Sequence, residues 1–429
     1  MRIKRLTIEG FRNLDSVSLK LSKLNVLIAL NNYGKSNVIK AINFGLHFIK
    51  ALPSEKVRMM GLEDVLPINK KNANKNYLFE LTFESMFDEQ AYVIQYSFSF
   101  EWIKEHNKGR KVLFESLKVK KSDKKQQFKT FIKRALNQAS YLSSETGRPN
   151  SKLPIEEDEL VLNKLEAIGT LFYQKILKEI LNISLQINTS LNVDGIFNTI
   201  HLNSPKFDKL ELNEHADIGE FIYALKKLHP DKFELLLDAI LSLLPGLESL
   251  EPIEIDFREK SSLESHEDIP FIIPEKLYKV RIKEKANNQS TSIGSLSSGS
   301  QRIIQILCLA FSAQMNNVPL LVFEELENSI HPSLLQRLLM ILNDLTGEAK
   351  MLLTSHSPYL LRYLEINNIY FGIPNKYKLA DFRKIEGKAK QKKLMKEVLE
   401  YETSLGEYIF DLLIESANEP NELTEYIFS

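Results

Sequence analysis

Residue types that bind phosphate occur together in Leu24–Asn37, whose sequence is LNVLIALNNYGKSN. An apolar run precedes Ala29–Ser36 and an apolar-periodic segment follows, so the pattern predicts a strand, a tight loop and a helix start. At such a turn the backbone N–H groups hold an anion, the lysine reaches the β- and γ-phosphates, and the hydroxyl binds Mg²⁺. Lys35 and Ser36 are the candidates. Alone the match is weak, because Gly-Lys-Ser turns arise by chance and Ala29 replaces the first glycine of G-x-x-x-x-G-K-[ST].

A second candidate for anion binding is Ser292–Arg302, SIGSLSSGSQR, which leads into an apolar helix. Hydroxyls and amides at a helix N-terminus favour a negative charge. A serine N-cap accounts for the same residues without any ligand, and for this stretch taken alone it is the commoner explanation.

Two further apolar strands end in polar groups that could act on a phosphate. Leu320–Phe323 is followed by Glu324 and Glu325, of which one can bind a metal and the other can orient or deprotonate a water. Lys350–Pro358 (KMLLTSHSP) contains His356, a candidate γ-phosphate sensor. Open α/β sheets bind ligands at the carboxyl ends of their strands. The alternative is two surface glutamates and a structural histidine.

Hydrophobic periodicity places these motifs on secondary structure. The predicted strands are 2–8, 17–21, 24–28, 78–83, 91–100, 112–119, 253–257 and 278–282. The predicted helices are 38–51, 160–181 and 218–244, the last divided by Pro230 and ended by Pro245-Gly246. The strands between 78 and 119 suggest an antiparallel meander, and the polar segment 143–159 is the best linker candidate.

The composition is that of an ordinary globular protein, with 429 residues, 43% hydrophobic and 26% charged. Lys+Arg and Asp+Glu each number 56, so nucleic-acid binding would need a local patch. Two stretches could supply one: 104–134 has twelve basic against three acidic residues, and 376–396 has nine against two. A solvated face is the commoner explanation of the first.

Targeting signals and cysteine usage bear on the compartment. The single cysteine, Cys308, excludes a disulfide framework and fits a reducing environment. The N-terminus lacks the apolar region of a secretory signal, and no run approaches the ~18 apolar residues of a membrane span. We expect a cytoplasmic protein that does not enter a membrane.

Taken together, the motifs resemble those of ABC-type ATPases of the RecF/SMC/OLD-like class, soluble ATPases of which many act in phage defence. In chain order they are Walker A at 29–36, the ABC signature at 296–299, Walker B at 322–325, the D-loop region at 327–332 and the switch-histidine loop at 354–358. The opening GFRN, Gly10–Asn13, also resembles the start of these heads. The resemblance covers roughly residues 1–50 and 285–365.

The resemblance implies an α/β fold: an ABC-type P-loop ATPase head with a mixed sheet flanked by helices, an antiparallel β meander and a mainly helical insertion. It implies ATP and Mg²⁺ as cofactors, Ser36 and Glu324 as metal ligands, Glu325 as the general base and His356 as the residue that steadies the γ-phosphate. The implied nucleotide-binding residues are Arg12, Asn31, Asn32, Tyr33, Gly34, Lys35, Ser36, Asn37, Ser297, Ser298 and Gly299.

In this class two heads dimerise with ATP between Walker A of one and the signature of the other. Ser297 and Gly299 of a second chain would then contact the γ-phosphate. We therefore expect a homodimer of heads, or a higher oligomer built from it.

We expect four parts in the chain. They are an N-terminal ATPase lobe at 1–135, a compact, mainly helical insertion at 136–250, a C-terminal ATPase lobe at 251–372 and a C-terminal segment at 373–429. The end of that segment, 397–429, has nine acidic residues, no Lys or Arg and many apolar residues. For it we slightly favour helices docked on the protein's own core over a helix that docks a partner.

Two functions of different classes fit these motifs. The first is a dimerising, ATP-dependent conformational switch that regulates a separate effector protein in antiphage defence. The second is a DNA-repair or DNA-tethering ATPase that uses the basic stretches. A transporter subunit is disfavoured, because the insertion between Walker A and the signature is too large.

Two features bear on the reaction itself. Only Asp381 and Asp411 follow His356 as aspartates, so we expect no Toprim-type nuclease domain. Glu324 stands where aspartate is usual, so we expect secure nucleotide binding and slow hydrolysis.

Overall fold

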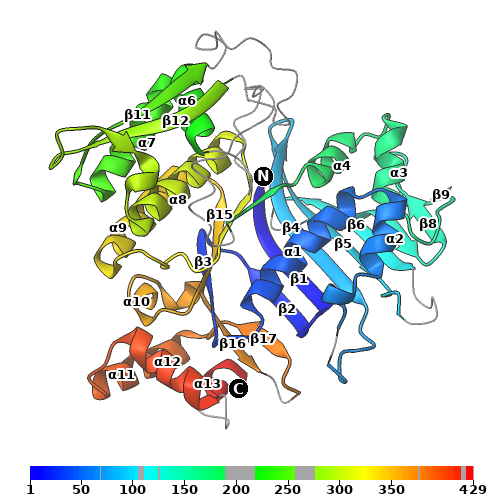
Figure 1. Cartoon of the computed structure of the whole chain (residues 1–429). Helices are drawn as coiled ribbons and strands as arrows, with labels where there is room; N and C mark the ends of the chain where they lie inside the picture. Colours follow the sequence, from blue (N-terminus) through cyan, green and yellow to red (C-terminus); the bar gives the residue numbers. More distant parts are fainter. Residues whose placement is uncertain are drawn as a thin grey trace, which may run out of the picture. The chain divides into compact units, whose positions relative to one another are not determined.

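The computed structural model describes residues 1–67, 69–104, 111–123, 126–188, 218–256, 276–374, 377–416 and 422–428. The chain divides into two compact units (Figure 1). The first unit comprises Met1–Leu185 and Lys350–Ser429, and the second unit comprises Gln186–Ala349. Phe257, the last residue of one predicted strand, and parts of both basic stretches (105–110, 124–125 and 376) lie outside the described residues.

The first unit contains a mixed sheet. Its strands in spatial order are β15 (Lys350–Ser355), β3 (Leu24–Ile28), β16 (Ile369–Pro374), β17 (Ala380–Arg383), β2 (Leu14–Lys20), β1 (Arg2–Phe11), β4 (Tyr77–Phe87), β5 (Gln90–Phe100), β6 (Val112–Lys121), β7 (Lys129–Ala135), β8 (Gln138–Tyr141) and β9 (Ser151–Leu153). β3 is parallel to both β15 and β16, and β17 is parallel to β2. The other neighbouring pairs are antiparallel. The predicted mixed α/β fold is confirmed.

The register of the parallel strands β15 and β3 determines where the polar residues that follow them lie. Thr354 pairs with Leu27 and Ser355 pairs with Ile28, so β15 and β3 end side by side at one edge. β3 is buried except for its first residue, as expected of a strand with both faces covered. The loop that follows β3 and His356, which follows β15, therefore leave the sheet at the same edge.

The predicted meander is confirmed and continues further than predicted. β4, β5 and β6 pair in antiparallel order, and β7, β8 and β9 extend the series. The predicted linker at 143–159 is wrong in part, because Ser151–Leu153 pairs with β8. β9 is a short polar edge strand, a kind of strand whose composition resembles that of a loop.

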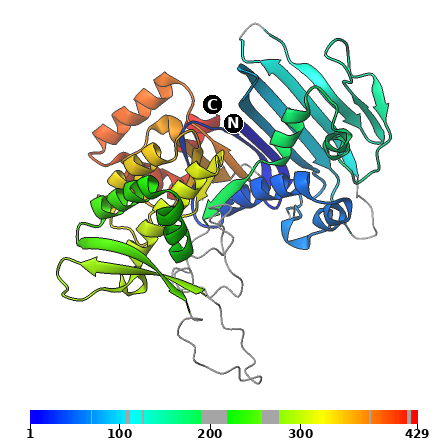
Figure 2. The ribbon, with the colours of Figure 1, turned by 90° about the horizontal axis from the view of Figure 1, so that it is seen from above.

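Helices cover this sheet in the first unit. They include α1 (Lys35–Lys50), α2 (Pro53–Met60), the 3₁₀ turn η1 (Glu63–Val65), α3 (Val161–Ile168) and α4 (Gln174–Leu181). α1 packs on β1 and β2, and its Phe48 ring stacks on Phe98 and Phe100 of β5. The helical prediction for 160–181 holds for two helices, divided at Gly169, whose φ is +73°. Figures 1 and 2 show α1, in blue, lying against the sheet of this unit.

The C-terminal segment also belongs to the first unit. It forms α10 (Pro358–Leu361), the 3₁₀ turn η3 (Ile366–Asn368), α11 (Lys388–Glu400), α12 (Leu405–Ser416) and α13 (Glu422–Phe428). α12 packs on α10, α11 and α13. Ile409, Leu413 and Leu423 are at most 2% exposed. The acidic, apolar end is therefore docked on its own unit, as we favoured.

The second unit is built around a buried helix, α8 (Ser298–Met315). The surrounding elements are β10 (Leu185–Asn188), α6 (Ile218–Leu228), α7 (Pro230–Leu243), β11 (Leu247–Asp256), β12 (Lys276–Glu284), β13 (Thr291–Ser292), the 3₁₀ turn η2 (Ile293–Ser295), β14 (Leu320–Phe323) and α9 (Pro332–Leu345). α8 is buried along most of its length and packs against α6, α7 and α9. β14 pairs with β10, and β11, β12 and β13 form a separate antiparallel sheet.

Pro230 begins α7, so the predicted division of 218–244 at this proline is confirmed. The predicted insertion 136–250 spans the boundary between the two units, since its residues up to 185 belong to the first unit and the others to the second. The four-part division with boundaries at 135, 250 and 372 differs from the two units and stays a prediction. Among the described helices, none combines the length and apolar character needed to cross a membrane.

Candidate nucleotide-binding site

The turn between β3 and α1 has the conformation that a phosphate-binding loop requires. Gly34 is the residue before the helix and has φ +101°, a left-handed value that favours glycine. A Cβ at this position would lie 3.0 Å from Asn13 Oδ1 and 3.0 Å from Ala380 Cβ. Asn32 also has a positive φ, +63°. Ala29, which replaces the first motif glycine, is fully buried and does not have a positive φ, so its methyl group is tolerated.

The N-terminus of α1 is suited to an anion. The helix has no side-chain cap and no acidic residue in its first turn. By contrast, the N-terminus of α8 is capped by its own Ser297. The first N–H groups of α1 are thus available to a phosphate, whose charge the helix dipole favours. Ser36, Asn31 and Asn32 are exposed, and Tyr33 is half-buried.

Lys35 bends back onto the loop. Its side chain is 6% exposed, and Nζ donates hydrogen bonds to the carbonyl oxygens of Ala29 (2.7 Å) and Leu30 (3.1 Å). Nζ also lies 3.2 Å from Nδ1 of His356. An ammonium group can only donate, so Nδ1 of the histidine accepts. The two residues are 321 positions apart in the sequence. Their side chains meet because β3 and β15 are neighbouring parallel strands whose carboxyl ends lie side by side.

Arg12 supports the first turn of α1. Its φ is +49°, and Nη1 donates to Oδ1 of Asn37 at 3.0 Å. Asn37 in turn donates to Oδ1 of Asn13 at 2.7 Å. The β1–β2 turn and the helix start are thereby linked through three side chains. Arg12 and Asn37 therefore lie beside the β3–α1 loop, together with Asn13, for which the sequence predicted no role. The binding of nucleotide by Arg12 and Asn37 stays a prediction.

The signature stretch lies in the second unit. Ser297 is the N-cap of α8 and its Oγ accepts a hydrogen bond from the Ser300 N–H at 3.3 Å, so the N-cap explanation applies to it. Ser297 and Ser298 are both exposed. A Cβ on Gly299 would lie 2.3 Å from the carbonyl oxygen of Ser329, so only glycine lets α8 approach the 327–332 stretch this closely.

The acidic end of β14 is also in the second unit. The Glu324 N–H donates to the carbonyl oxygen of Asn188 on β10 at 3.0 Å. Glu325 has φ +48°, an uncommon value for a non-glycine residue. Its carboxylate accepts a hydrogen bond from Nδ2 of Asn328 at 2.5 Å. Both glutamates are half-buried at the point where the strand ends.

Arg302 is a residue of this region to which the sequence analysis assigned no role. It lies in the first turn of α8, is 1% exposed, and donates from Nη2 to the Glu324 carbonyl oxygen at 3.3 Å and from Nη1 to Gln305 at 3.2 Å. Burial lowers the pKa of Arg302 to about 10, and the charges of Glu325 and Glu327 oppose this shift. Its sequence signal is a basic residue at the start of an otherwise apolar helix.

Comparison with protein families identifies the chain. A model described as an AAA ATPase domain matches residues 1–361. The chain belongs to this family of AAA ATPase domains. The β3–α1 loop and His356 lie within the matched range, and so do the signature stretch and the acidic end of β14. A search of curated protein sequences finds no match.

Solved structures similar to this AAA ATPase include heads of SMC proteins. One is an SMC head bound to the C-winged helix domain of ScpA (14% identity, 91% of this chain and 100% of that chain, TM-score 0.47). Another is the SMC head domain from Thermotoga maritima (13% identity, 90% and 100%, TM-score 0.43). A third is an Smc head with an extended coiled coil bound to the C-terminal domain of ScpA, from Pyrococcus furiosus (13% identity, 92% and 99%, TM-score 0.45).

Proposed function

We propose that this AAA ATPase is an ATP-dependent conformational switch that binds the triphosphate and Mg²⁺ at the β3–α1 loop. The observation that carries the proposal is the contact of 3.2 Å between Lys35 Nζ and His356 Nδ1. The lysine of the Gly-Lys-Ser turn and the histidine that follows the neighbouring parallel strand thus lie together at the carboxyl ends of β3 and β15. Both side chains are suited to a γ-phosphate.

The residues of the first unit fit this ligand. Lys35 is held by carbonyl oxygens of its own loop, and it exchanges them for phosphate oxygens, which are stronger acceptors for an ammonium. The uncapped N-terminus of α1 supplies N–H groups, and the exposed Ser36 hydroxyl is placed to bind a metal ion. Bound Mg²⁺ would neutralise charge on the β- and γ-phosphates.

For the second unit we propose roles that rest on the order of the motifs in the chain. Glu324 binds the metal directly or through water, and Glu325 is the general base. The hydrogen bond from Asn328 holds the Glu325 carboxylate in one orientation. Glu324 has one methylene more than the usual aspartate, which moves its carboxylate, so hydrolysis is slow. Catalysis then consists of positioning and charge stabilisation without a covalent intermediate.

The switch we propose is a dimer. Ser297, Ser298 and the backbone of Gly299 contact the nucleotide of a second copy, because the family resemblance places ATP between two heads. The exposure of both serines in the single chain is compatible with this role. ATP closes the dimer, and a separate effector protein of an antiphage defence system responds to the change. Hydrolysis reopens it.

The variant Glu325→Gln tests this proposal. It should bind ATP with the parent's affinity, form an ATP-dependent dimer in size-exclusion chromatography with light scattering, and hydrolyse ATP at least about 100-fold more slowly. Asp344→Asn, an exposed carboxylate on α9 of the same unit, should behave as the parent. Hydrolysis at the parent's rate by Glu325→Gln would show that Glu325 is not the base, and a monomer with ATP would refute the dimer.

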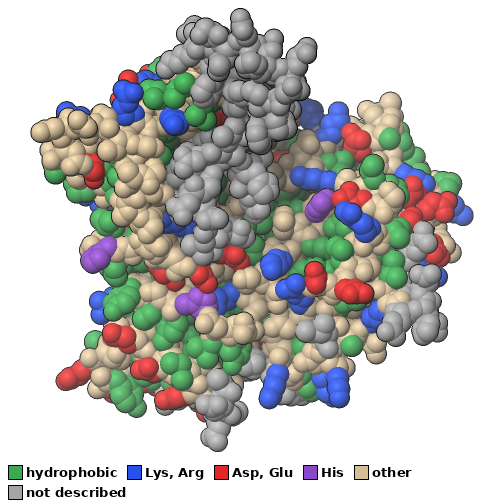
Figure 3. Space-filling model, viewed as in Figure 1, with side chains coloured by type: hydrophobic (Ala, Val, Ile, Leu, Met, Phe, Trp, Pro, Cys, Tyr) green, Lys and Arg blue, Asp and Glu red, His purple; other side chains and the backbone are tan. Residues whose placement is uncertain are grey.

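The described residues of the first basic stretch add no observation that favours the DNA-binding alternative. In the described part of 104–134, Lys111 pairs with Glu157 at 3.3 Å and Lys120 lies over the ring of Phe128. Figure 3 shows Lys and Arg side chains interspersed with Asp and Glu over the strands of the first unit on the face in view. DNA binding with an affinity that falls steeply as the salt concentration rises would support this alternative.

A further inference from the structure

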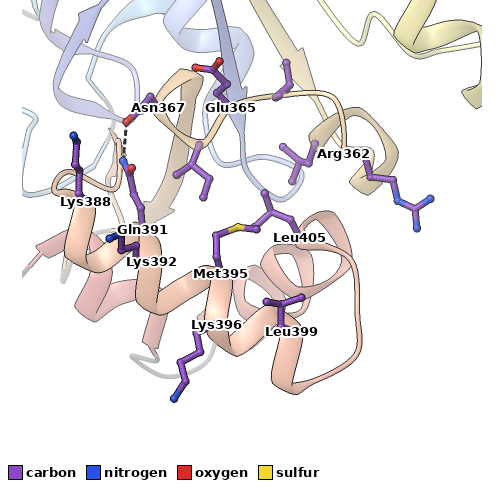
Figure 4. A pocket seen from close by; sticks show the side chains of 13 residues that line it. Arg362, Glu365, Asn367, Lys388, Gln391, Lys392, Met395, Lys396, Leu399 and Leu405 are labelled. Atoms are coloured by element: carbon purple, nitrogen blue, oxygen red, sulfur yellow. Dashed lines mark hydrogen bonds between the residues drawn. The ribbon is translucent and has the colours of Figure 1, made fainter.

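A groove of about 860 Å³ lies in the first unit, along one side of α11. Its opposite wall is the segment 361–367, and the start of α12 closes one end (Figure 4). Gln391 of α11 donates to Oδ1 of Asn367 at 2.7 Å and to the carbonyl oxygen of Ile385 at 2.9 Å, which fixes the helix at the other end. None of the residues assigned to ATP lines the groove, whose first lining residue is Leu361.

The floor of the groove is apolar and aliphatic. It is formed by Leu361, Leu364, Ile366, Met395, Leu399 and Leu405. α11 thus has two apolar sides: Leu394 and Val398 face inward and are at most 5% exposed, whereas Met395 is 41% and Leu399 75% exposed. Figure 4 shows Met395 and Leu405 pointing into the groove from different helices. A leucine this exposed beside other apolar groups is characteristic of an interaction surface.

The rim of the groove is basic. Arg362, Lys388, Lys392 and Lys396 line it, against one acidic residue, Glu365. Lys396 pairs with Glu400 at 3.2 Å, a contact between exposed groups that contributes little free energy. In Figure 4 Arg362, Lys388 and Lys396 extend outward from the edges of the groove. The charge of the rim therefore favours an acidic occupant.

The spacing along α11 indicates the shape of the occupant. The lining positions 388, 391, 392, 395, 396 and 399 recur at intervals of three and four, so the groove follows the helix axis. α11 has 13 residues and is therefore about 20 Å long. A partner helix of about four turns matches this length and places apolar side chains every third or fourth residue on the floor.

We propose that this groove binds an acidic amphipathic α-helix of a partner protein. The apolar face of that helix contacts Met395, Leu399 and Leu405, and its acidic flanks meet the lysines of the rim. A nucleic acid fits less well, because the floor is aliphatic and its lining includes no aromatic ring on which a base could stack. The inference concerns a surface outside the nucleotide site and does not depend on ATP binding.

A designed peptide tests the proposal on the full-length protein. The probe is a fluorescein-labelled peptide of about 16 residues with leucines at helical spacing and glutamates elsewhere, and its partner probe has the same composition in scrambled order. Fluorescence anisotropy should show binding of the first and at least about fivefold weaker binding of the second. Leu399→Gln and Met395→Gln should each lower the affinity for the first peptide at least about fivefold, because they remove apolar contact area.

Matched controls separate the groove from general charge attraction. Leu235→Gln, at a leucine of α7 that is 59% exposed, should leave the affinity unchanged. Lys392→Gln should weaken binding of the peptide more than Lys178→Gln does. Lys178 is an exposed lysine on α4. The proposal is overturned if no binding occurs, if the scrambled peptide binds equally well, or if Leu399→Gln has no effect. If duplex DNA displaces the peptide from the parent protein and binds Leu399→Gln as tightly as the parent, the surface is assigned to nucleic acid.

Discussion

At the scale of single residues, the contact between Lys35 and His356 defines the candidate site. The Lys35 ammonium is held by the loop carbonyl oxygens of Ala29 and Leu30 and by the histidine. These acceptors keep a nearly buried cation satisfied. In the function that we propose, phosphate oxygens take the place of these acceptors, since they accept hydrogen bonds from an ammonium more strongly than carbonyl oxygens do.

Gly299 gives a sharp test of local packing in the second unit. A methyl group there would lie 2.3 Å from the Ser329 carbonyl oxygen, so Gly299→Ala must displace either α8 or the 327–332 stretch. We expect a loss of about 1–3 kcal/mol in the free energy of unfolding and a clear loss of ATP hydrolysis. Denaturant unfolding and phosphate release measure the two effects.

The control for this substitution is Gly246→Ala. A Cβ at Gly246 would meet no heavy atom within 4 Å, and its φ is not positive. Its stability should stay within about 0.5 kcal/mol of the parent's. If Gly299→Ala is as stable and as active as Gly246→Ala, the close approach of α8 to Ser329 does not matter for function.

At the scale of elements, the sequence predicts what depends on local patterning. Alternation predicted β4, β5 and β6, and Pro230 predicted the start of α7. β7 and β9 were missed because their outward residues are lysines and serines, whose composition resembles that of a solvated loop. Arg302 was missed because a basic residue at the start of an apolar helix, which is its signal in the sequence, reveals neither its burial nor its hydrogen bond to the Glu324 carbonyl oxygen.

Glu115 illustrates an element held by one buried side chain. On β6 it is fully buried and accepts hydrogen bonds from the N–H groups of Val161 (2.5 Å) and Leu162 (2.9 Å), and from the Tyr96 hydroxyl at 2.9 Å. It therefore caps α3 from the sheet, although 46 residues separate them. Burial raises the pKa of Glu115, and these hydrogen bonds and the charge of Arg134 oppose the shift.

We expect Glu115→Ala to lower the free energy of unfolding by about 3–5 kcal/mol. It leaves the buried N–H groups of Val161 and Leu162 without their acceptor, and it removes the negative charge that favours the charged form of the buried Arg134. Glu145→Ala, at an exposed glutamate of the same unit, should stay within about 0.5 kcal/mol of the parent. Equal stability of the two variants in urea unfolding would show that the cap contributes nothing.

At the scale of the whole molecule, the stretches that resemble ATPase motifs are divided between the two units. The β3–α1 loop and His356 lie in the first unit, whereas the signature stretch and the acidic end of β14 lie in the second. The sequence suggested boundaries where the composition changes. The two units instead follow contacts between distant segments, such as the pairing of β15 with β3, which composition does not reveal.

ATP binding by Lys35→Ala tests the central claim most directly, with isothermal titration calorimetry in the presence of Mg²⁺ as the measurement. The matched control is Lys40→Ala, at an exposed lysine on the same helix. We predict that Lys35→Ala weakens ATP binding at least about 100-fold, because charge-assisted hydrogen bonds to phosphate are lost. Lys40→Ala should bind as the parent does. An affinity of Lys35→Ala within about threefold of the parent's would contradict the assignment of the β3–α1 loop as the nucleotide site.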